Sequence, residues 1–227
     1  MDAREIRDMF SLIAPRYDLL NNLLSLGCHQ RWRRWALRLL APQPGDRAVD
    51  LATGTGDMAL LLAKAVAPGG QVLGVDFCPE MLARAQLKAE GHPWGHLCTF
   101  TEGDILNLDL PPESADLATI AFGLRNVTDL VRGLGQIIEI LKPEGKLLII
   151  DLAQPNWPGL DLYLDYVVPW FGRLFSPYPA AYEYLPRSLS TYPAPEELKE
   201  LGLSLGLRKM SYHKLWGGLV SIHLGVR

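Results

Sequence analysis

Hydrophobic and polar positions alternate with two different periods along most of this 227-residue chain. Short apolar runs typical of buried strands lie at residues 47–52, 71–76, 96–104, 115–122 and 145–153. Apolar positions at helical spacing lie between most of them, at residues 58–66, 79–90 and 128–142. Alternating strands and helices predict an α/β fold with a doubly wound, mostly parallel, Rossmann-like sheet. Thr128 or Asp129 can cap the last of these helices.

The C-terminal region departs from this alternation. A helical pattern at residues 195–206 is followed by two strand-like runs, at 209–216 and 219–227. Gly217 and Gly218 separate the two runs, which predicts an antiparallel hairpin with a two-residue turn. We therefore expect a C-terminal antiparallel hairpin to complete the parallel sheet.

Two segments lie outside the core of what is expected to be a single domain, 1–227. Residues 1–42 form a predicted N-terminal helical cap, and residues 153–194 form an insertion between the last parallel strand and the last helix. Nine of the 28 positions from 157 to 184 are aromatic, compared with 9% of the whole chain. This enrichment predicts a lid over an apolar ligand, with an ordinary packed subdomain as the alternative.

Charge and cysteine content narrow the classes of function. The net charge of -3 gives no general attraction to phosphate backbones, so no nucleic acid is expected as a partner. The three cysteines form no C-x-x-C pair, which argues against a disulfide framework or a zinc site, and we expect no metal. The N-terminus lacks the apolar core of a signal peptide, and no stretch reaches about 18 apolar residues. A cytoplasmic protein without membrane spans is expected.

A glycine-containing loop follows the first predicted strand, in the sequence DLATGTGD at residues 50–57. Gly54 and Gly56 allow the backbone to approach a ligand closely at the end of the strand. Asp76 ends the second strand 20 residues after Gly56, where an acid reaches ribose hydroxyl groups. A nicotinamide-binding domain would show the same two features, so they indicate a nucleoside ligand without identifying it.

The distribution of acids indicates which nucleoside ligand is expected. Asp57 lies at a helix N-terminus and Asp50 near the end of the preceding strand, so a pyrophosphate would be repelled there and a cation attracted. S-adenosylmethionine carries an ammonium and a sulfonium group and has no phosphate. Asp104 follows the third strand and is placed to accept a hydrogen bond from an adenine amino group. We therefore expect S-adenosyl-L-methionine rather than NAD as the cofactor.

Five motifs together resemble the ubiquinone/menaquinone biosynthesis C-methyltransferase family. They are YDLLNNLLSLGCHQRW (17–32), ATGTGD (52–57), FGLRNVTD (122–129), LKPEGKLLIIDLAQP (141–155) and YEYLPRSLSTYP (182–193). The resemblance runs from about Phe10 to the C-terminus. The family often has Glu-Phe-Ser where this chain has Asp151-Leu152-Ala153, and Ser or Gly where Ala121 stands.

The resemblance implies a class I methyltransferase that transfers a methyl group to a ring carbon of a polyprenylated or phytylated quinol, such as demethylmenaquinol. It implies these cofactor-binding residues: Asp50, Gly54, Thr55, Gly56, Asp76, Asp104, Ile105 and Ala121. The alternatives are a methyltransferase for another apolar small molecule, an NAD-dependent reductase, and a protein that binds without catalysis. Naphthoquinol and benzoquinol acceptors are not distinguished, and the oligomeric state is open, with a homodimer as one option.

The implied reaction assigns roles to three residues. A ring carbon attacks the sulfonium methyl only when the adjacent phenol is at least partly ionised, and the Arg125 guanidinium can stabilise that phenolate. A surface salt bridge, for example from Arg125 to Asp129, is the alternative role. Asn126 can hold the other quinol oxygen or an ordered water, and Tyr17 is a candidate acceptor contact. The base stays open among Asp18, His29 and a water bound by Arg125 and Asn126.

A lipid tail requires access from a bilayer. The segment QRWRRWALRLL at residues 30–40 combines arginine with tryptophan and leucine, so it could lie on an anionic membrane surface. The solvated face of an ordinary helix is the competing interpretation. Because the expected quinol substrate is lipophilic, we expect the protein to make transient contact with the inner face of the membrane.

Overall fold

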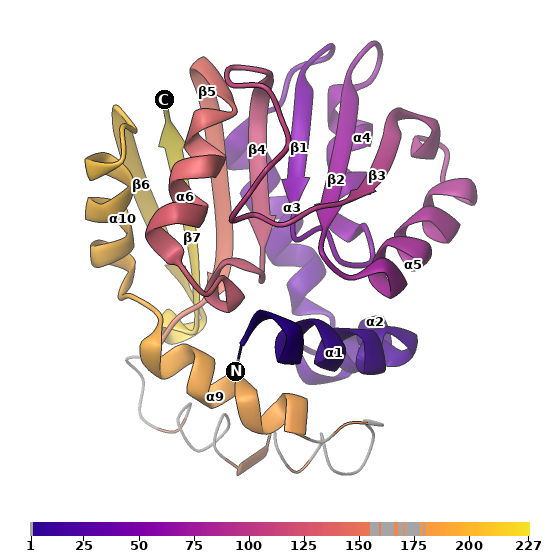
Figure 1. Cartoon of the computed structure of the whole chain (residues 1–227), viewed down its shortest axis with the longest axis vertical. Coiled ribbons are helices and arrows are strands. Elements are labelled where there is room, and N and C mark those ends of the chain that lie inside the picture. The colour runs from indigo at the N-terminus through magenta and orange to yellow at the C-terminus, as the bar shows by residue number, and fades with distance from the viewer. Residues whose placement is uncertain (1, 155–158, 160–165, 168–169, 171–177, 179) are drawn as a thin grey trace.

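The computed structural model describes residues 2–154, 159, 166–167, 170, 178 and 180–227, and it contains one mixed seven-stranded sheet (Figure 1). The strands are β1 (Arg47–Leu51), β2 (Gln71–Asp76), β3 (Cys98–Glu102), β4 (Ala115–Ala121), β5 (Leu141–Leu152), β6 (Lys209–Leu215) and β7 (Val220–Val226). Their order across the sheet is β3-β2-β1-β4-β5-β7-β6. β1 to β5 pair in parallel, and β7 pairs antiparallel with β5 and with β6. The predicted doubly wound sheet with a C-terminal hairpin is confirmed.

Helices cover both faces of this sheet (Figure 1). They are α1 (Ala3–Ile13), α2 (Tyr17–Leu24), α3 (Cys28–Leu40), α4 (Asp57–Val66), α5 (Pro79–Glu90), α6 (Leu130–Glu139), α9 (Ala180–Thr191) and α10 (Pro195–Ser204). Successive side chains of a strand point to opposite faces, so β1 directs Ala48 and Asp50 to one face and Val49 and Leu51 to the other. Ala48 joins a core cluster with α3 and α4, whereas Val49 and Leu51 join one with α6 and α10.

The strand order places a crevice between β1 and β4. The chain moves from β1 to β2 and β3 on one side and then crosses back to β4 and β5 on the other. The loops that follow β1 and β4 therefore diverge at the carboxyl edge of the sheet. Open α/β sheets bind their ligands at such a switch point.

Two local predictions need correction. Leu215 pairs with Val220, so four residues connect the hairpin strands, and Gly217 lies inside a 3₁₀ turn, η5 (Trp216–Gly218). The predicted two-residue turn is therefore wrong. The fifth strand begins at Leu141, four residues before the predicted start.

The N-terminal helices lie across the carboxyl ends of the strands. α1 and α2 are joined by a 3₁₀ turn, η1 (Ala14–Arg16), and lie below the sheet in Figure 1. α3 instead packs on the sheet, and its Trp32, Ala36 and Leu40 are buried in the core. This burial argues against the docking of α3 on a bilayer and favours an ordinary packed helix. Among the described residues, no helix has both the length and the apolar character needed to cross a membrane.

Of the 42 positions of the predicted aromatic lid at 153–194, 20 lie outside the described residues. α9 is the helix of this region that the structure describes, and it contacts a 3₁₀ turn, η3 (Leu124–Asn126), that follows β4. The lid therefore stays a prediction.

Candidate active site

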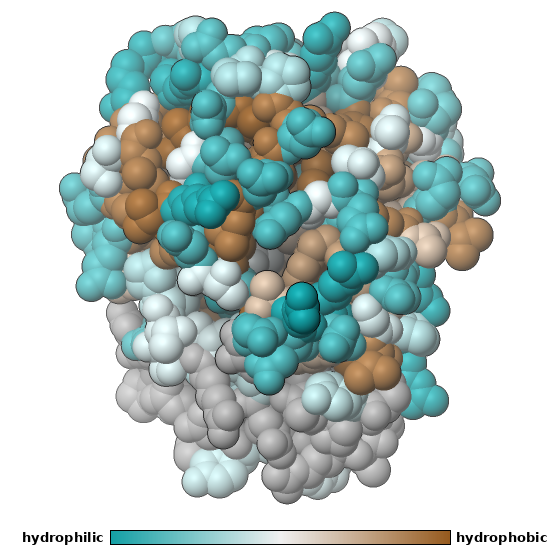
Figure 2. Space-filling view, viewed as in Figure 1, coloured by the Kyte–Doolittle hydropathy of each residue, from teal (hydrophilic) through white to brown (hydrophobic). Residues whose placement is uncertain are grey.

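A cavity of about 790 Å³, including the part open to solvent, lies between the strand ends and the N-terminal helices. In Figure 2 the surface is hollowed in this region, and apolar atoms are visible in the hollow. Its lining residues come from the N-terminal helices and from the segments that follow β1, β2, β3 and β4. They are Ala3, Phe10, Tyr17, Ala52, Gly54, Asp76, Phe77, Met81, Gly103, Asp104, Ile105, Leu106, Ala121, Phe122, Gly123, Asn126, Val127 and Thr128.

Asp76 is the central acidic group of this lining. One carboxylate oxygen accepts a hydrogen bond from the Gly54 backbone N–H at 2.8 Å, and the other accepts one from the Cys78 N–H at 3.0 Å. Burial raises the pKa of this carboxyl, although the backbone N–H groups oppose the shift. Each oxygen keeps a further lone pair, so the geometry permits the predicted acceptance of ribose hydroxyl groups.

The loop after β1 takes a conformation that requires its glycines. Gly54 and Gly56 have φ angles of 56° and 83°, and a Cβ at Gly56 would approach the Ala85 Cβ to 3.0 Å. Of the predicted cofactor-binding residues, five line the cavity: Gly54, Asp76, Asp104, Ile105 and Ala121. Thr55 and Gly56 instead lie behind the lining, where they shape the loop.

Asp50 also lies behind the lining. Its carboxylate is 1% exposed and accepts hydrogen bonds from the hydroxyl groups of Thr53 and Thr119, each at 2.6 Å. Burial raises the pKa of Asp50 to about 6, and the two hydroxyl groups only partly offset this effect. Asp50 does not line the cavity, so the structure does not support a direct contact between its carboxylate and the cofactor. Its charge lies next to the glycine loop after β1.

The negative charge of Asp57 is balanced by neighbouring cations, whereas the sequence had suggested an unpaired carboxylate. Its carboxylate accepts hydrogen bonds from Gln30 at 2.7 Å and from Lys88 at 2.8 Å, and it lies 3.9 Å from Arg33. Although burial opposes ionisation, Arg33 and Lys88 lower the pKa of this carboxyl below its usual value. The acidic character of the site therefore comes from Asp50, Asp76 and Asp104.

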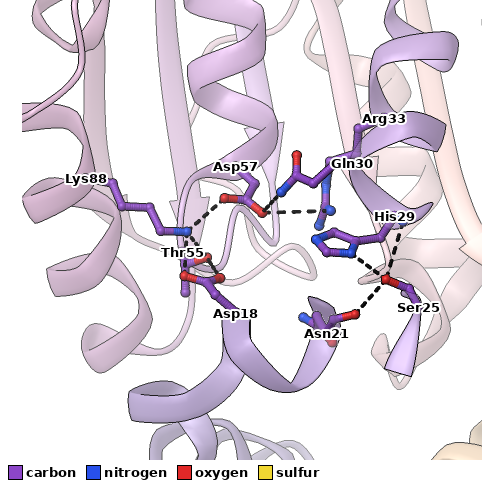
Figure 3. A network of polar contacts seen from close by, with 9 residues as sticks. All are labelled: Asp18, Asn21, Ser25, His29, Gln30, Arg33, Thr55, Asp57 and Lys88. Carbon is purple, nitrogen blue, oxygen red and sulfur yellow. Dashed lines mark hydrogen bonds and ion pairs between the residues drawn. The ribbon is translucent and has the colours of Figure 1, made fainter. Parts of the chain in front are cut away.

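A polar network fastens the N-terminal cap to the cofactor loop (Figure 3). Lys88 on α5 binds both Asp18 on α2, at 2.6 Å, and Asp57. The Thr55 hydroxyl group also donates to Asp18, at 2.6 Å. Three segments distant in sequence are thereby joined at one lysine, and the cap is held over the cavity.

Two of the candidate bases belong to this network rather than to the cavity lining. Asp18 is engaged by Lys88 and Thr55, and the His29 Nδ1 lies 2.6 Å from the Ser25 hydroxyl group. Burial, assisted by Arg33, lowers the pKa of His29 to about 4. An imidazole with this pKa is a weak base, and neither residue lines the cavity described above.

Arg125 forms a buried ion pair with Asp151, at the end of β5. The guanidinium donates to the Asp151 carboxylate at 2.6 Å and to the Phe122 carbonyl oxygen at 2.7 Å, and the Arg125 backbone N–H donates to the other Asp151 oxygen. The Asp151 side chain is fully buried and that of Arg125 is 11% exposed. Burial alone would lower the pKa of Arg125, but Asp151 raises it, so the cation is permanent. The alternative of a surface pair with Asp129 is wrong, because Asp129 caps α6.

Asn126 presents an unused acceptor in the cavity lining. Its Oδ1 is buried and has no hydrogen-bond partner among the described residues. Tyr17, another predicted acceptor contact, also lines the cavity and packs edge-on against Phe10. Phe122, directly after β4, has a φ of 63°, a conformation that is uncommon for a bulky residue. The structure thus brings Tyr17 and Asn126 to the cavity, with Arg125 behind them.

Sequence reasoning missed three residues of this region. Asp151 entered only as a departure from the family pattern, although a charge after four buried apolar strand residues needs a partner. Arg33 was expected on either a membrane surface or a solvated helix face, yet it is 6% exposed. Lys88 carried no signal in the sequence, because its partners Asp18 and Asp57 lie at least 31 residues away.

A family model described as the ubiE/COQ5 methyltransferase family matches residues 1–227. The chain belongs to this family. A demethylmenaquinone methyltransferase of Thermus thermophilus is 45% identical over 223 residues, covering 96% of this chain and 100% of that protein. A ubiquinone/menaquinone biosynthesis C-methyltransferase, UbiE, of Geobacter sulfurreducens is 40% identical over 224 residues, covering 97% and 87%.

A solved structure agrees on the fold. A SAM-dependent methyltransferase from Thermotoga maritima matches with a TM-score of 0.69 at 18% identity, covering 96% of this chain and 98% of that one. This ubiE/COQ5 family member is an enzyme, and S-adenosyl-L-methionine is its methyl donor. The cavity fits the donor, because buried Asp76 and the nearby Asp104 offer acceptors for a nucleoside, and none of the described residues that line it is a cation that would repel the sulfonium.

The Asp76→Asn variant of this methyltransferase is expected to bind S-adenosylmethionine at least tenfold more weakly. The amide keeps one oxygen acceptor but loses charge-assisted hydrogen bonds worth roughly 1.5–3 kcal/mol each. Titration calorimetry measures the change, with exposed Asp109→Asn as the matched control. Unchanged affinity, or tight binding of NADH by the wild type, would remove Asp76 from the cofactor site.

Proposed function

We propose that the enzyme methylates a ring carbon of a polyprenylated quinol, with demethylmenaquinol as the acceptor and menaquinol as the product. The relatives named above include a demethylmenaquinone methyltransferase, which supports this acceptor. The observation that carries the proposal is a largely apolar cavity whose lining includes Asn126, with a buried Oδ1 that has no hydrogen-bond partner among the described residues. A quinol ring with few polar groups matches such a lining.

The chain supplies positioning and exclusion of water. S-adenosylmethionine, when bound, supplies an electrophilic methyl group on a sulfonium. We place the quinol ring between Phe10 and Tyr17 of the cap and the segment after β4, because both groups of residues line the cavity. Packing of the cap then holds the ring carbon in line with the methyl group, which is the main contribution that an already reactive donor needs.

Asn126 is the proposed contact for a quinol hydroxyl group. Its Oδ1 can accept a hydrogen bond from that hydroxyl group, or it can hold a water that takes the ring proton after methyl transfer. Such a water fits the cavity better as a base than Asp18 or His29, since both have partners outside the lining. The protonated base then returns its proton to solvent.

Arg125 is proposed to act on the acceptor through two contributions. Its ties to Asp151 and to the Phe122 carbonyl fix the η3 turn, which orients the adjacent Asn126. Its permanent charge favours the phenolate form of the quinol, although Asp151 offsets part of that charge. The second contribution is the role that the sequence predicted for Arg125. Because Arg125 is paired with Asp151, its stabilisation of the phenolate is weaker than that of an unpaired cation.

Contact with the membrane is proposed to involve α1, α2 and the turn after α2 rather than α3. Four leucines there have exposed fractions between 38% and 80%: Leu12, Leu19, Leu23 and Leu26. These helices also contribute Phe10 and Tyr17 to the cavity. A lipid tail could therefore pass from a bilayer at the inner face of the membrane to the cavity along one apolar surface.

A product assay tests this function. The protein, labelled S-adenosylmethionine and reduced demethylnaphthoquinones and demethylbenzoquinones are incubated, and the products are identified by mass spectrometry. We expect methylated naphthoquinol as the main product and turnover of the oxidised quinones at least tenfold slower, because only the electron-rich quinol ring is nucleophilic. Activity should survive chelators. Equal turnover of oxidised and reduced rings, or rescue of chelated enzyme by zinc or magnesium, would contradict the mechanism.

A further inference from the structure

Arg33 is a buried cation that lacks adequate partners. Its side chain is 7% exposed, and its Nε and Nη1 have no hydrogen-bond acceptor among the described residues. The nearest carboxylate, Asp57, is 3.9 Å away and already accepts hydrogen bonds from Lys88 and Gln30. A desolvated guanidinium with unused donors is costly, so this position is built to receive an anionic acceptor.

The guanidinium stands at the crevice between β1 and β4. Arg33 reaches Asp57, which begins α4 directly after the glycine loop, as Figure 3 shows. On its other side the guanidinium carbon lies 5.0 Å from the centre of the Phe122 ring, and Phe122 lines the cavity. Arg33 thus lies behind the cavity lining, next to Phe122 and between the two loops that diverge at the switch point.

The strand order fixes which end of the methyl donor arrives there. Asp104 follows β3 and Asp76 ends β2, so the contacts expected of these acids with adenine and ribose put the adenosine part over that half of the sheet. The amino-acid part must then extend towards β1 and β4, the next strands in the order. Its α-carboxylate is the one anionic group of the donor.

We propose that Arg33 binds the α-carboxylate of S-adenosylmethionine. The guanidinium fork matches a carboxylate in geometry. Asp50 lies on the face of β1 that packs against α3, the helix of Arg33, and supplies a negative charge near the ammonium group. Together the two residues complement the zwitterion of an amino acid. In this role Arg33 selects donors that carry a carboxylate and joins α3 of the cap to cofactor binding.

Decarboxylated S-adenosylmethionine provides the decisive probe, because it lacks only the group in question. Titration calorimetry without any quinol compares both donors on the full-length wild type, Arg33→Met, Arg33→Lys and Arg34→Met, the last being an exposed arginine on the same helix. We expect the wild type and Arg34→Met to prefer the carboxylated donor at least tenfold. Arg33→Met should lose most of that preference by weaker binding of S-adenosylmethionine alone, and Arg33→Lys should keep part of it.

Two outcomes would overturn the proposal: a wild type that does not discriminate between the donors, or an Arg33→Met variant that weakens both equally, as a merely structural arginine would. Thermal midpoints are measured in parallel. If the Met variant unfolds, the Lys variant decides, because an unchanged preference there also contradicts the role. Since this role rests on the methyl donor and not on the quinol, failure to methylate quinols would leave the result intact.

Discussion

Arg125→Met is expected to lower kcat about 100-fold while the dissociation constant of S-adenosylmethionine stays nearly unchanged. Groups that stabilise developing charge, or that fix a contact to the acceptor, mainly lower the free energy of the transition state. This stabilisation is typically ~3 kcal/mol. Arg125→Lys should recover only part of the rate, because a compact ammonium does not reproduce the planar guanidinium whose Nη1 donates to both the Asp151 carboxylate and the Phe122 carbonyl oxygen. Higher pH should narrow the gap, because solvent then ionises the phenol.

The same substitution is expected to destabilise the fold by about 3–5 kcal/mol, because it leaves the fully buried Asp151 carboxylate without its partner. A second variant separates the two effects. In Arg125→Met/Asp151→Asn no charge is stranded, and the amide can still accept a backbone N–H, so stability should largely return while kcat should not. Arg208→Met, which breaks an exposed pair with Glu144, should cost at most about 1 kcal/mol.

Steady-state kinetics and chemical denaturation of these four proteins test both statements. If the double variant regains wild-type kcat, then Arg125 matters only for stability. If Arg125→Met alone keeps full kcat, its role at the acceptor is wrong. A destabilisation no larger than that of Arg208→Met would mean that the pair is not desolvated as the structure shows.

Asp50→Asn is expected to stabilise the ligand-free protein at pH 8 by about 3 kcal/mol. The pKa of Asp50 is raised from 3.8 to about 6 in the folded state, so the folded protein binds this proton more tightly than the unfolded chain does. The contribution of the carboxyl to stability is therefore complete below about pH 3.8 and is lost as the pH rises through about 6. An amide at this position is neutral at every pH and can still bond to Thr53 and Thr119.

The advantage of Asp50→Asn should therefore shrink as the pH falls from 8 to 4. Urea denaturation at a series of pH values measures this difference, and subtraction of the wild type removes the contributions of other groups such as Asp76. The exposed Asp109→Asn should show no comparable change. The variant should also bind S-adenosylmethionine more weakly above pH 6, since the ammonium group then loses a nearby carboxylate. A gain in stability that does not depend on pH would mean that Asp50 is not protonated near pH 6.

Local sequence patterns determined the architecture and the donor end of the site. Strands and helices follow from hydrophobic periodicity over a few residues, and the glycines of the β1 loop follow from a backbone requirement that is also local. Acids at the ends of three parallel strands had to meet, because parallel strands end at one edge of the sheet. Gly54, Asp76 and Asp104 could therefore be placed together from the sequence, and the structure brings all three into one cavity.

Tertiary structure alone decided how the charges are paired and which face of each helix is covered. The arginine and tryptophan pattern of α3 would suit a bilayer as well as a sheet, and only the packing of Trp32 against the core distinguishes them. Arg125 and Asp151 are separated by 26 residues, and Lys88 and Asp18 by 70, so no local period could pair them. The physical reason is that an ion pair depends on distance and burial in space, whereas a sequence records separation along the chain and the pattern of one face at a time.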